Sequence, residues 1–136
     1  AEVAVSKAPV VMLDHLQEVE LRLEKQELRT YAIARLLTRL RTIGIRQQKV
    51  LWLNGQLSRE IDKREGTPRL SDIADSSAIE RAARIVLLLY WPWKHDPDRP
   101  NTDYELWVAK NSEGGTGRVP LTYYAASGKF TDRQES

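Results

Sequence analysis

The chain has 136 residues, the length of one small domain, and hydrophobic residues make up 41% of it, which is enough for a core. It contains no cysteine, and this excludes disulfide bonds, zinc sites built on thiolates and cysteine nucleophiles. No run approaches the roughly 18 apolar residues of a membrane span, and residues 1–8 lack the features of a signal peptide. These properties predict a cytoplasmic protein that does not enter a membrane.

The formal net charge of +2 is too small to predict nucleic-acid binding from bulk electrostatics. Basic side chains nevertheless gather in the first third of the chain and again in a later stretch: Arg22, Arg29, Arg35, Arg39, Arg41, Arg46 and Lys49, then Arg59, Lys63, Arg64 and Arg69. On composition alone, a solvated helix face followed by a polar loop is the simplest interpretation of these clusters.

The first predicted element is a strand at Val10–Leu13, because an unbroken apolar run is typical of a parallel strand buried on both faces. A helix is predicted from Glu18 to Ile43. Its apolar residues recur at helical spacing and form one stripe: Leu28, Ala32, Leu36, Leu40 and Ile43. Gly44 follows this stripe and is expected to end the helix.

A second strand is predicted at Val50–Leu53, and the charged stretch Leu57–Ser71 is predicted to be a long exposed loop. The segment Ser77–Glu80 has the spacing of a capping box, which favours a short helix that continues to Arg84. The very apolar run Ile85–Tyr90 then predicts a third buried strand.

The proline-containing residues 91–104 are predicted to form a variable loop. In this loop Trp91 and Trp93 are either a partner-binding aromatic patch or, more simply, hydrophobic cover for the edge of a sheet. Two strands, Glu105–Lys110 and Arg118–Tyr124, are joined through glycines and predict a hairpin. The whole order predicts an α/β fold with parallel strands first and antiparallel strands last. Such a core needs helices on both faces, so we expect part of the domain to be missing from this chain.

Two polar residues directly follow predicted strands. Asp14 ends the first apolar run, and Gln56 lies just beyond the second. Because α/β sheets bind ligands at the carboxyl ends of their strands, Asp14 could hold Mg²⁺ through water beside a nucleotide. The neutral amide of Gln56 could contact a γ-phosphate or orient water. Taken singly, Asp14 is more simply interpreted as a turn-capping aspartate and Gln56 as an ordinary loop glutamine.

Taken in order, several segments of the chain resemble the motor domain of DnaB-type replicative DNA helicases. The first resembles the Walker B segment of that family, and the others resemble its later motifs, ending in its closing hairpin. The segments are Val10-Val11-Met12-Leu13-Asp14-His15-Leu16-Gln17, Gln56-Leu57-Ser58-Arg59-Glu60, Arg69-Leu70-Ser71-Asp72-Ile73 with Ser76, Ile79, Glu80, Ala83 and Ile85–Tyr90, and Val108-Ala109-Lys110-Asn111 with Gly115-Thr116-Gly117. The resemblance covers nearly the whole chain in the family's order.

This resemblance implies the C-terminal part of a RecA-like P-loop NTPase core, which is an α/β fold that ends in an antiparallel hairpin. It implies a hexameric ring that couples ATP hydrolysis to movement along single-stranded DNA. By position, Asp14 is the carboxylate of the Mg²⁺ site and Gln56 is the γ-phosphate sensor. Lys110 is the hairpin lysine that reaches the nucleotide of the neighbouring subunit. The implied partners are the N-terminal half of the same protein, identical subunits, and a primase or loader.

The resemblance also assigns residues 57–76 to a region that faces DNA. Contacts with the DNA backbone are expected from Arg69 and from the loop that contains Ala74, Asp75, Ser76 and Ser77. Such contacts with phosphates do not depend on sequence and weaken with salt.

One departure from the family pattern concerns the closing hairpin. The family usually has Ala-Lys-Asn-Arg there, and its arginine acts as a finger on the adjacent γ-phosphate, whereas this chain has Ser112 after Asn111. An arginine finger is worth ~10³-fold or more in turnover. Ser112 therefore predicts weak activation between subunits unless Arg118 substitutes for the missing arginine.

Other departures affect the DNA loop and the helix after it. The usual Arg-Glu-Ser-Gly is replaced by residues 74–77, which removes a guanidinium and a glycine. Ala82 and Arg84 stand where the family usually has aspartates, and His15 stands where tyrosine is usual. The lost guanidinium would bind a phosphate, and the lost glycine would let the backbone approach the DNA strand closely.

The chain has no phosphate-binding loop of the form Gly-x-x-x-x-Gly-Lys-Ser/Thr, since the pair Gly128-Lys129 is followed by Phe130. The resemblance places that loop and the catalytic glutamate upstream of this chain, so the isolated chain is expected not to hydrolyse ATP efficiently. An alternative is a degenerate, non-catalytic assembly or DNA-binding module of the same fold. A RecA-like recombinase or clock-type ATPase is a third possibility, which fits the hairpin segment less well.

Overall fold

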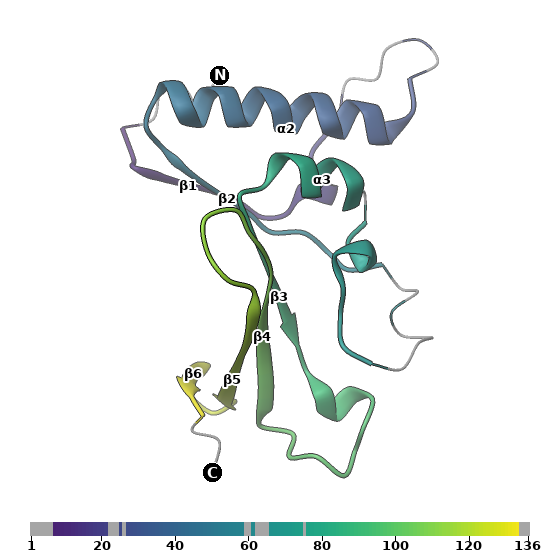
Figure 1. The fold of residues 1–136 in the computed structure, drawn as a ribbon, viewed down its shortest axis with the longest axis vertical. Helices are drawn as coiled ribbons and strands as arrows, with labels where there is room; N and C mark the ends of the chain where they lie inside the picture. Colours follow the sequence, from purple (N-terminus) through teal and green to yellow (C-terminus); the bar gives the residue numbers. More distant parts are fainter. Residues whose placement is uncertain are drawn as a thin grey trace. The chain divides into compact units, whose positions relative to one another are not determined.

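The structure, a computed structural model, describes residues 7–21, 25, 27–58, 61, 66–74 and 76–133. The chain divides into two compact units, whose elements are labelled in Figure 1. The first unit takes in Ala1–Ser58 and Ile73–Ala82, and the second takes in Arg59–Asp72 and Ala83–Ser136. Among the described residues, no helix combines the length and the apolar character that crossing a membrane requires.

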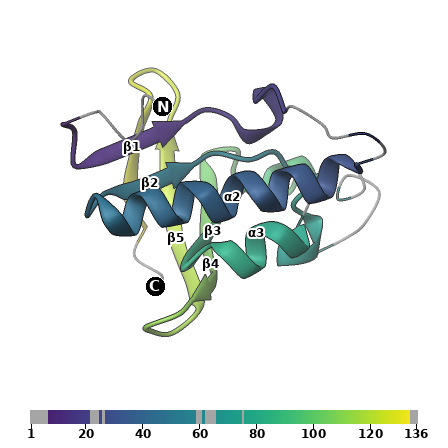
Figure 2. The same cartoon turned by 90° about the horizontal axis from the view of Figure 1, so that it is seen from above.

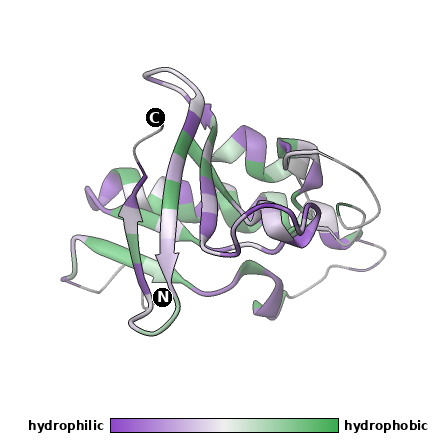
Figure 3. Cartoon of the chain, turned by 90° about the horizontal axis from the view of Figure 1, so that it is seen from below, coloured by the Kyte–Doolittle hydropathy of each residue, from purple (hydrophilic) through white to green (hydrophobic). Residues whose placement is uncertain are grey.

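In the first unit, β1 (Val10–Leu13) pairs in parallel with β2 (Val50–Leu53), residue for residue. Parallel strands need a crossover connection, and here it contains the 3₁₀ turn η1 (Leu16–Glu18) and the helix α2 (Arg29–Arg46). The two strands lie side by side in Figure 2, and the unbroken hydrophobic colour of β1 can be followed in Figure 3. Both predicted strands and their boundaries are confirmed.

A small hydrophobic core lies between α2, α3 (Ser76–Ala82) and the turn after β1, and the two helices run side by side in Figure 2. Its buried residues are Leu16, Ile33, Leu37 and Ala78, and partly buried side chains pack around them. Full burial of an aliphatic side chain such as Ile33 contributes roughly 1.5–3 kcal/mol. Because Leu16 belongs to this core, the segment that carries Asp14 is anchored only two residues away.

The predicted boundaries of the long helix are wrong. α2 begins at Arg29 rather than near Glu18, and Leu28, predicted to open the apolar stripe, is 66% exposed. The buried face consists of Ala32, Ile33, Leu37, Leu40 and Gly44. Leu36 and Ile43 are only half-buried, at the margin of this face. The packed face therefore differs from the predicted stripe by about one residue along the helix.

Gly44 does not end the helix, which continues to Arg46. It is buried where α2 meets β2, and a Cβ atom at this position would lie 3.2 Å from Leu51 Cδ1. The missing side chain lets the helix approach the strand closely. The left-handed backbone conformation occurs later, at Gln48 with φ of 50°.

The prediction that β1 and β2 are buried on both faces is wrong. Val10, Met12, Val50 and Trp52 are 49%, 64%, 59% and 46% exposed. The alternate residue Leu13 packs against the core below α2, as expected when successive side chains point to opposite faces. The described helices of this unit thus cover one face of the parallel pair.

In the second unit, four strands form an antiparallel sheet in chain order: β3 (Ile85–Tyr90), β4 (Asp103–Asn111), β5 (Gly117–Tyr124) and β6 (Lys129–Asp132). The predicted hairpin of β4 and β5 is confirmed. The prediction of β3 as a strand buried on both faces is wrong, because its residues alternate, with Val86 and Leu88 buried. Strand β6 is not among the predicted elements, since its four residues include a single strongly apolar side chain, Phe130.

Residues 91–104 contain the 3₁₀ turn η4 (Pro92–Lys94) and the start of β4. The ring of Trp91 stacks on Trp93 at 5.0 Å and on Tyr104 at 5.7 Å between centroids. Tyr104 in turn meets Tyr123 and Phe130 edge to face. The tryptophans therefore pack within the sheet unit, as the simpler interpretation of this loop expects.

The predicted loop Leu57–Ser71 contains the 3₁₀ turn η3 (Leu70–Asp72), while residues 59, 60 and 62–65 lie outside the described residues. α3 begins at Ser76 and ends at Ala82. Ser77 therefore lies inside the helix instead of capping it, and the helix is shorter than predicted at its C-terminal end.

Candidate functional site

The carboxyl ends of β1 and β2 carry a cluster of polar side chains, beginning with Asp14. Backbone pairing continues past the strands, since Asn54 N donates to Leu13 O at 3.0 Å and Leu16 N donates to Asn54 O at 2.9 Å. This brings the exposed Asp14 carboxylate next to Asn54, whose Nδ2 donates to Asp14 Oδ1 at 3.1 Å. The peptide bond between Asp14 and His15 is cis.

The amide of Asn54 is itself held in orientation. Trp52 Nε1 donates to Asn54 Oδ1 at 2.7 Å, which leaves the NH₂ group of Asn54 to face Asp14. The chain Trp52–Asn54–Asp14 therefore orients the carboxylate at the edge of the parallel sheet while leaving it open to solvent.

Gln56 lies in the same cluster. Its side-chain Nε2 lies 3.0 Å from His15 Nε2, within hydrogen-bond distance. Its backbone N–H donates to Gln17 Oε1 at 3.2 Å. The structure therefore brings the predicted site residues Asp14 and Gln56 to one edge, through residues that directly follow each strand.

The cluster fits the way in which proteins hold Mg²⁺ beside a nucleotide. Among the described residues, no group of three or more His, Cys, Asp or Glu side chains could form a complete metal cage. Mg²⁺ keeps several waters and needs only one or two protein carboxylates when phosphates supply other ligands. The exposed Asp14 offers such a carboxylate, and this donor set suits the metal of a nucleotide better than a resident metal.

The predicted DNA contacts divide between the two units. Ala74 and Ser77 belong to the first unit, where Ser77 is exposed in the first turn of α3. Ser76 is the first residue of that helix, and Asp75 lies outside the described residues. Arg69 belongs to the second unit, exposed beside η3, where its N–H donates to Asp72 Oδ2 at 2.6 Å.

The backbone of Ala74 is hydrogen-bonded to Gln56, the predicted γ-phosphate sensor. Its N–H donates to Gln56 O at 3.4 Å, and the neighbouring Ile73 pairs with Leu57 in a short antiparallel bridge. The segment that leads into α3 therefore hydrogen-bonds directly to the loop after β2, within the first unit.

Lys110 lies near the end of β4, half-buried. Its Nζ donates to Ala83 O at 2.7 Å, just before β3 begins. Beyond it, Ser112 N donates to Arg84 O at 2.9 Å, and Arg84 forms an ion pair with Glu113. Two cations thus lie near this end of the sheet, Lys110 on β4 and Arg84 directly before β3.

Arg118 is engaged elsewhere, which argues against it as a substitute finger. Its Nη1 lies 3.2 Å from Oε1 of Glu105, a carboxylate that is only 2% exposed. Arg99 pairs with the same oxygen at 3.4 Å, and Trp107 Nε1 donates to Oε2 at 2.9 Å. Removing Arg118 from this group would leave a buried charge with fewer partners, which is costly.

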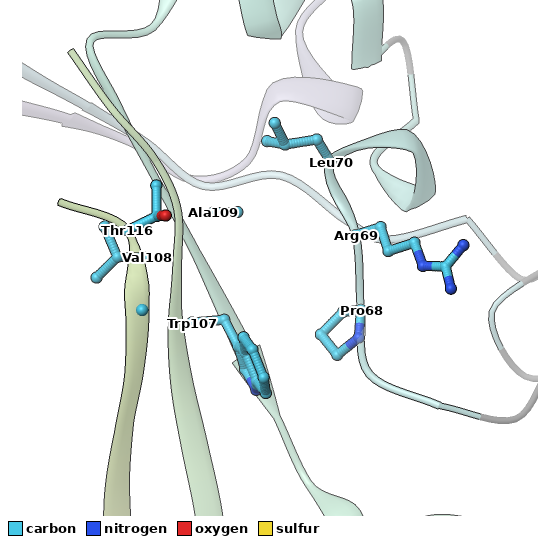
Figure 4. Close-up of a pocket in the computed structure, with 8 residues that line it drawn as sticks. Pro68, Arg69, Leu70, Trp107, Val108, Ala109 and Thr116 are labelled. Carbon is cyan, nitrogen blue, oxygen red and sulfur yellow. The ribbon is translucent and has the colours of Figure 1, made fainter.

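A pocket of about 330 Å³ lies in the second unit, between residues 68–70 and the hairpin. Its lining is mostly apolar: Pro68, Arg69, Leu70, Trp107, Val108, Ala109, Thr116 and Gly117. Figure 4 shows the Arg69 guanidinium turned away from Trp107 and Val108. The pocket therefore lacks converging polar groups, and the polar cluster around Asp14 is the better candidate for chemistry.

Three residues of the cluster are absent from the predicted site: His15, Gln17 and Asn54. Gln17 and His15 stand in the segment that resembles Walker B, so their place near Asp14 could have been foreseen, though their contacts with Gln56 could not. Gln17 Nε2 is buried without a hydrogen-bond partner among the described residues. Asn54 gives no sequence signal beyond its position directly after a strand.

The family model and the curated relatives that match this chain describe the same kind of protein. The family model "DnaB-like helicase C terminal domain" matches residues 2–132. The chain is 30% identical over 127 residues to a probable plasmid replicative DNA helicase of Chlamydia psittaci, covering 93% of this chain and 28% of that protein. It is 28% identical over 125 residues to the replicative DNA helicase DnaC of Bacillus subtilis (strain 168), covering 90% of this chain and 28% of that protein.

Solved structures give the same result. The chain resembles a DnaB-like replicative helicase, described with its interactions with primase, with a TM-score of 0.83 and 28% identity over 92% of this chain. It resembles a second solved structure, described as an ATPase domain, with a TM-score of 0.84 and 28% identity, again over 92% of this chain. It covers 30% and 44% of those two chains. The α/β fold expected from the sequence is confirmed.

Proposed function

Because this chain belongs to the DnaB-like helicase C-terminal domain family, we propose that it supplies the Walker B carboxylate, the γ-phosphate sensor and the closing hairpin of a replicative DNA helicase motor. The motor is a hexameric ring of identical subunits that couples ATP hydrolysis to movement along single-stranded DNA. The chain spans 28% of the length of the curated relatives described above. The phosphate-binding loop is proposed to come from an N-terminal half of the same protein.

The observation that carries this proposal is the joining of Asp14 and Gln56 at one edge of the parallel strands. Magnesium-bound ATP, when present, supplies the transferable γ-phosphoryl group and the charge neutralisation that its transfer needs. Asp14 would hold the metal through water, and Asn54 keeps that carboxylate in place. The amide of Gln56 would exchange His15 for the γ-phosphate and so report whether the phosphate is present.

The route from nucleotide to DNA is proposed to run through Ala74. Its N–H donates to Gln56 O, so a shift of Gln56 is passed to the segment that begins α3. Ser76 and Ser77 of that helix, with Asp75, are proposed to hold the DNA backbone, and Arg69 is proposed separately to contact DNA. Likeness to a helicase described with primase supports a primase as a further partner.

The test uses the longest polypeptide whose reading frame contains this chain. Its ATPase activity should be stimulated by single-stranded DNA, and Asp14→Ala should reduce that activity to background. Asp98→Asn, a change at an exposed carboxylate in the second unit, is the matched control and should leave it unchanged. Full activity in Asp14→Ala would rule out the Walker B assignment.

A second candidate function is a degenerate module that keeps the motor's shape without its activity. Ser112 and Ala74 favour it, because they replace arginines of the family pattern. Binding of a fluorescent ATP analogue to the same polypeptide separates the two candidates. A degenerate module should bind none, whereas the motor should bind it in the presence of Mg²⁺.

A further inference from the structure

The turn after β4 lacks the arginine of the family pattern, and an arginine stands instead in the bend before β3. Position 112, where the family pattern has the finger arginine, is serine, and position 84, where it has an aspartate, is arginine. These two positions are neighbours, because Ser112 N donates to Arg84 O at 2.9 Å. This bond directly follows the last pair of β3 and β4, Ile85 with Asn111, so the two positions are adjacent in space.

The surroundings of Arg84 are those of a cation that can reach outward. Its side chain is 60% exposed, and its ion-pair partner Glu113 is 76% exposed. Exposed ion pairs are weak, so Arg84 can leave Glu113 at little cost when a stronger anion arrives. Arg118 and Arg99 lack this freedom, since both pair with the buried carboxylate of Glu105.

Lys110 brings a second positive charge to the same end of the sheet. Its Nζ donates a hydrogen bond to the carbonyl oxygen of Ala83, the residue before Arg84. A guanidinium binds phosphate oxygens with two parallel hydrogen bonds, whereas an ammonium acts as a point charge. Such a pair suits the terminal phosphates of a nucleotide.

We propose that Arg84 is the finger residue of this chain, contacting the γ-phosphate of the nucleotide bound by the neighbouring copy, and that Glu113 holds it while that site is empty. This inference rests on the proposed function, which supplies the ring and the nucleotide. Glu113 acts as a positioning residue, because it touches Arg84 and not the nucleotide.

The decisive experiment measures DNA-stimulated ATP hydrolysis and Mg²⁺-dependent binding of an ATP analogue by the complete polypeptide. Arg84→Ala should lower kcat on the order of 10³-fold while nucleotide affinity stays close to wild type. Arg84→Lys should not recover the activity, since lysine lacks the planar fork. Arg41→Ala, at an exposed arginine of α2, is the matched control and should keep full activity.

Rescue separates a finger from a structural ion pair. The double variant Arg84→Ala with Ser112→Arg should regain much of the lost activity, because the guanidinium returns from the adjacent turn. Failure of this rescue, combined with a fall in melting temperature for Arg84→Ala that matches Glu113→Ala, would show that Arg84 serves the fold alone. Wild-type kcat in Arg84→Ala would overturn the inference directly.

Mixed rings test whether the residue acts between copies. Rings of Asp14→Ala subunits and rings of Arg84→Ala subunits should each be inactive, whereas mixing them should restore single-turnover hydrolysis at sites that pair an intact Asp14 with an intact Arg84. An absence of complementation would overturn action between copies. If Asp14→Ala rings are active, the proposed function fails; if they are inactive and Arg84→Ala rings are active, only this inference fails.

Discussion

Asn54 and Asp14 join the ends of the two parallel strands through a hydrogen bond from Nδ2 to Oδ1 of 3.1 Å. The bond links residues 40 positions apart, so it depends on the parallel register of β1 and β2. The carboxylate is exposed yet oriented, as a group that binds a metal through water should be.

Replacing Asn54 with leucine should weaken the response to Mg²⁺. The substitution removes the amide and keeps a similar volume, so Asp14 loses an oriented donor worth roughly 1.5 kcal/mol. We expect the Mg²⁺ concentration for half-maximal DNA-stimulated ATPase activity to rise about tenfold. Asn101→Ala, at an exposed position of the loop before β4, should not change it. An unchanged Mg²⁺ dependence in Asn54→Leu would contradict this role.

Gly44→Leu should destabilise the first unit. A Cβ atom there would lie 3.2 Å from Leu51 Cδ1 and 3.3 Å from Lys49 O, and a longer side chain must push α2 away from β2. Overpacking of this kind costs about 1–3 kcal/mol, which chemical unfolding in urea measures. Ile45→Leu, at the adjacent and 67% exposed position, is the control. Equal stability of the two variants would show that the helix moves aside freely.

Glu105→Gln should destabilise the sheet of the second unit. The buried carboxylate accepts hydrogen bonds from Arg99, Arg118 and Trp107, and the variant removes the charge that pairs with both arginines. The arginines are 35% and 36% exposed, so water compensates in part, and we expect a loss of about 1–3 kcal/mol. Urea unfolding followed by tryptophan fluorescence measures it. A variant as stable as wild type would mean that solvent replaces the carboxylate fully.

The sheet unit should lose stability at alkaline pH through Tyr104. Burial, and then the neighbouring Tyr123, raise the pKa of Tyr104 above its ordinary value of 10.0. The unfolded tyrosine therefore ionises first as pH rises, so the free energy of unfolding should be steady below pH 10 and fall above it. Tyr104→Phe should make this fall shallower. Thermal melts across pH 9 to 11 test it, and identical slopes in both proteins would contradict it.

The sequence alone predicted the strands and the edge residues well, for a physical reason. The apolar runs that end before Asp14 and Gln56 carry both the strand and the polar residues at its carboxyl end in one short segment. The start of α2 was not predictable in this way. The residues between Glu18 and Leu28 have ordinary helical propensity, so propensity alone does not mark the start of the helix. Tertiary packing marks it instead, because it buries Ile33 and Leu37 but not Leu28.

Contacts between distant positions were not predictable from the sequence either. Gln17 meets Gln56 across 39 positions, and Arg118 meets Glu105 only because the hairpin register places Arg118 opposite Trp107, two residues from that carboxylate. The suggestion that Arg118 replaces the missing finger rested on its place in the chain. Its partner depends on strand pairing, which residue types do not specify.

The buried carboxylate of Glu105 also limits which substitutions this protein can accept during evolution. A single replacement at position 99 or 118 leaves the buried carboxylate with fewer partners, and a replacement at position 105 removes the partner of both arginines, so each such step is penalised. Among close relatives, these three positions should therefore change together or not at all. Reconstructed ancestors that differ at only one of them should be less stable than either neighbour on the lineage.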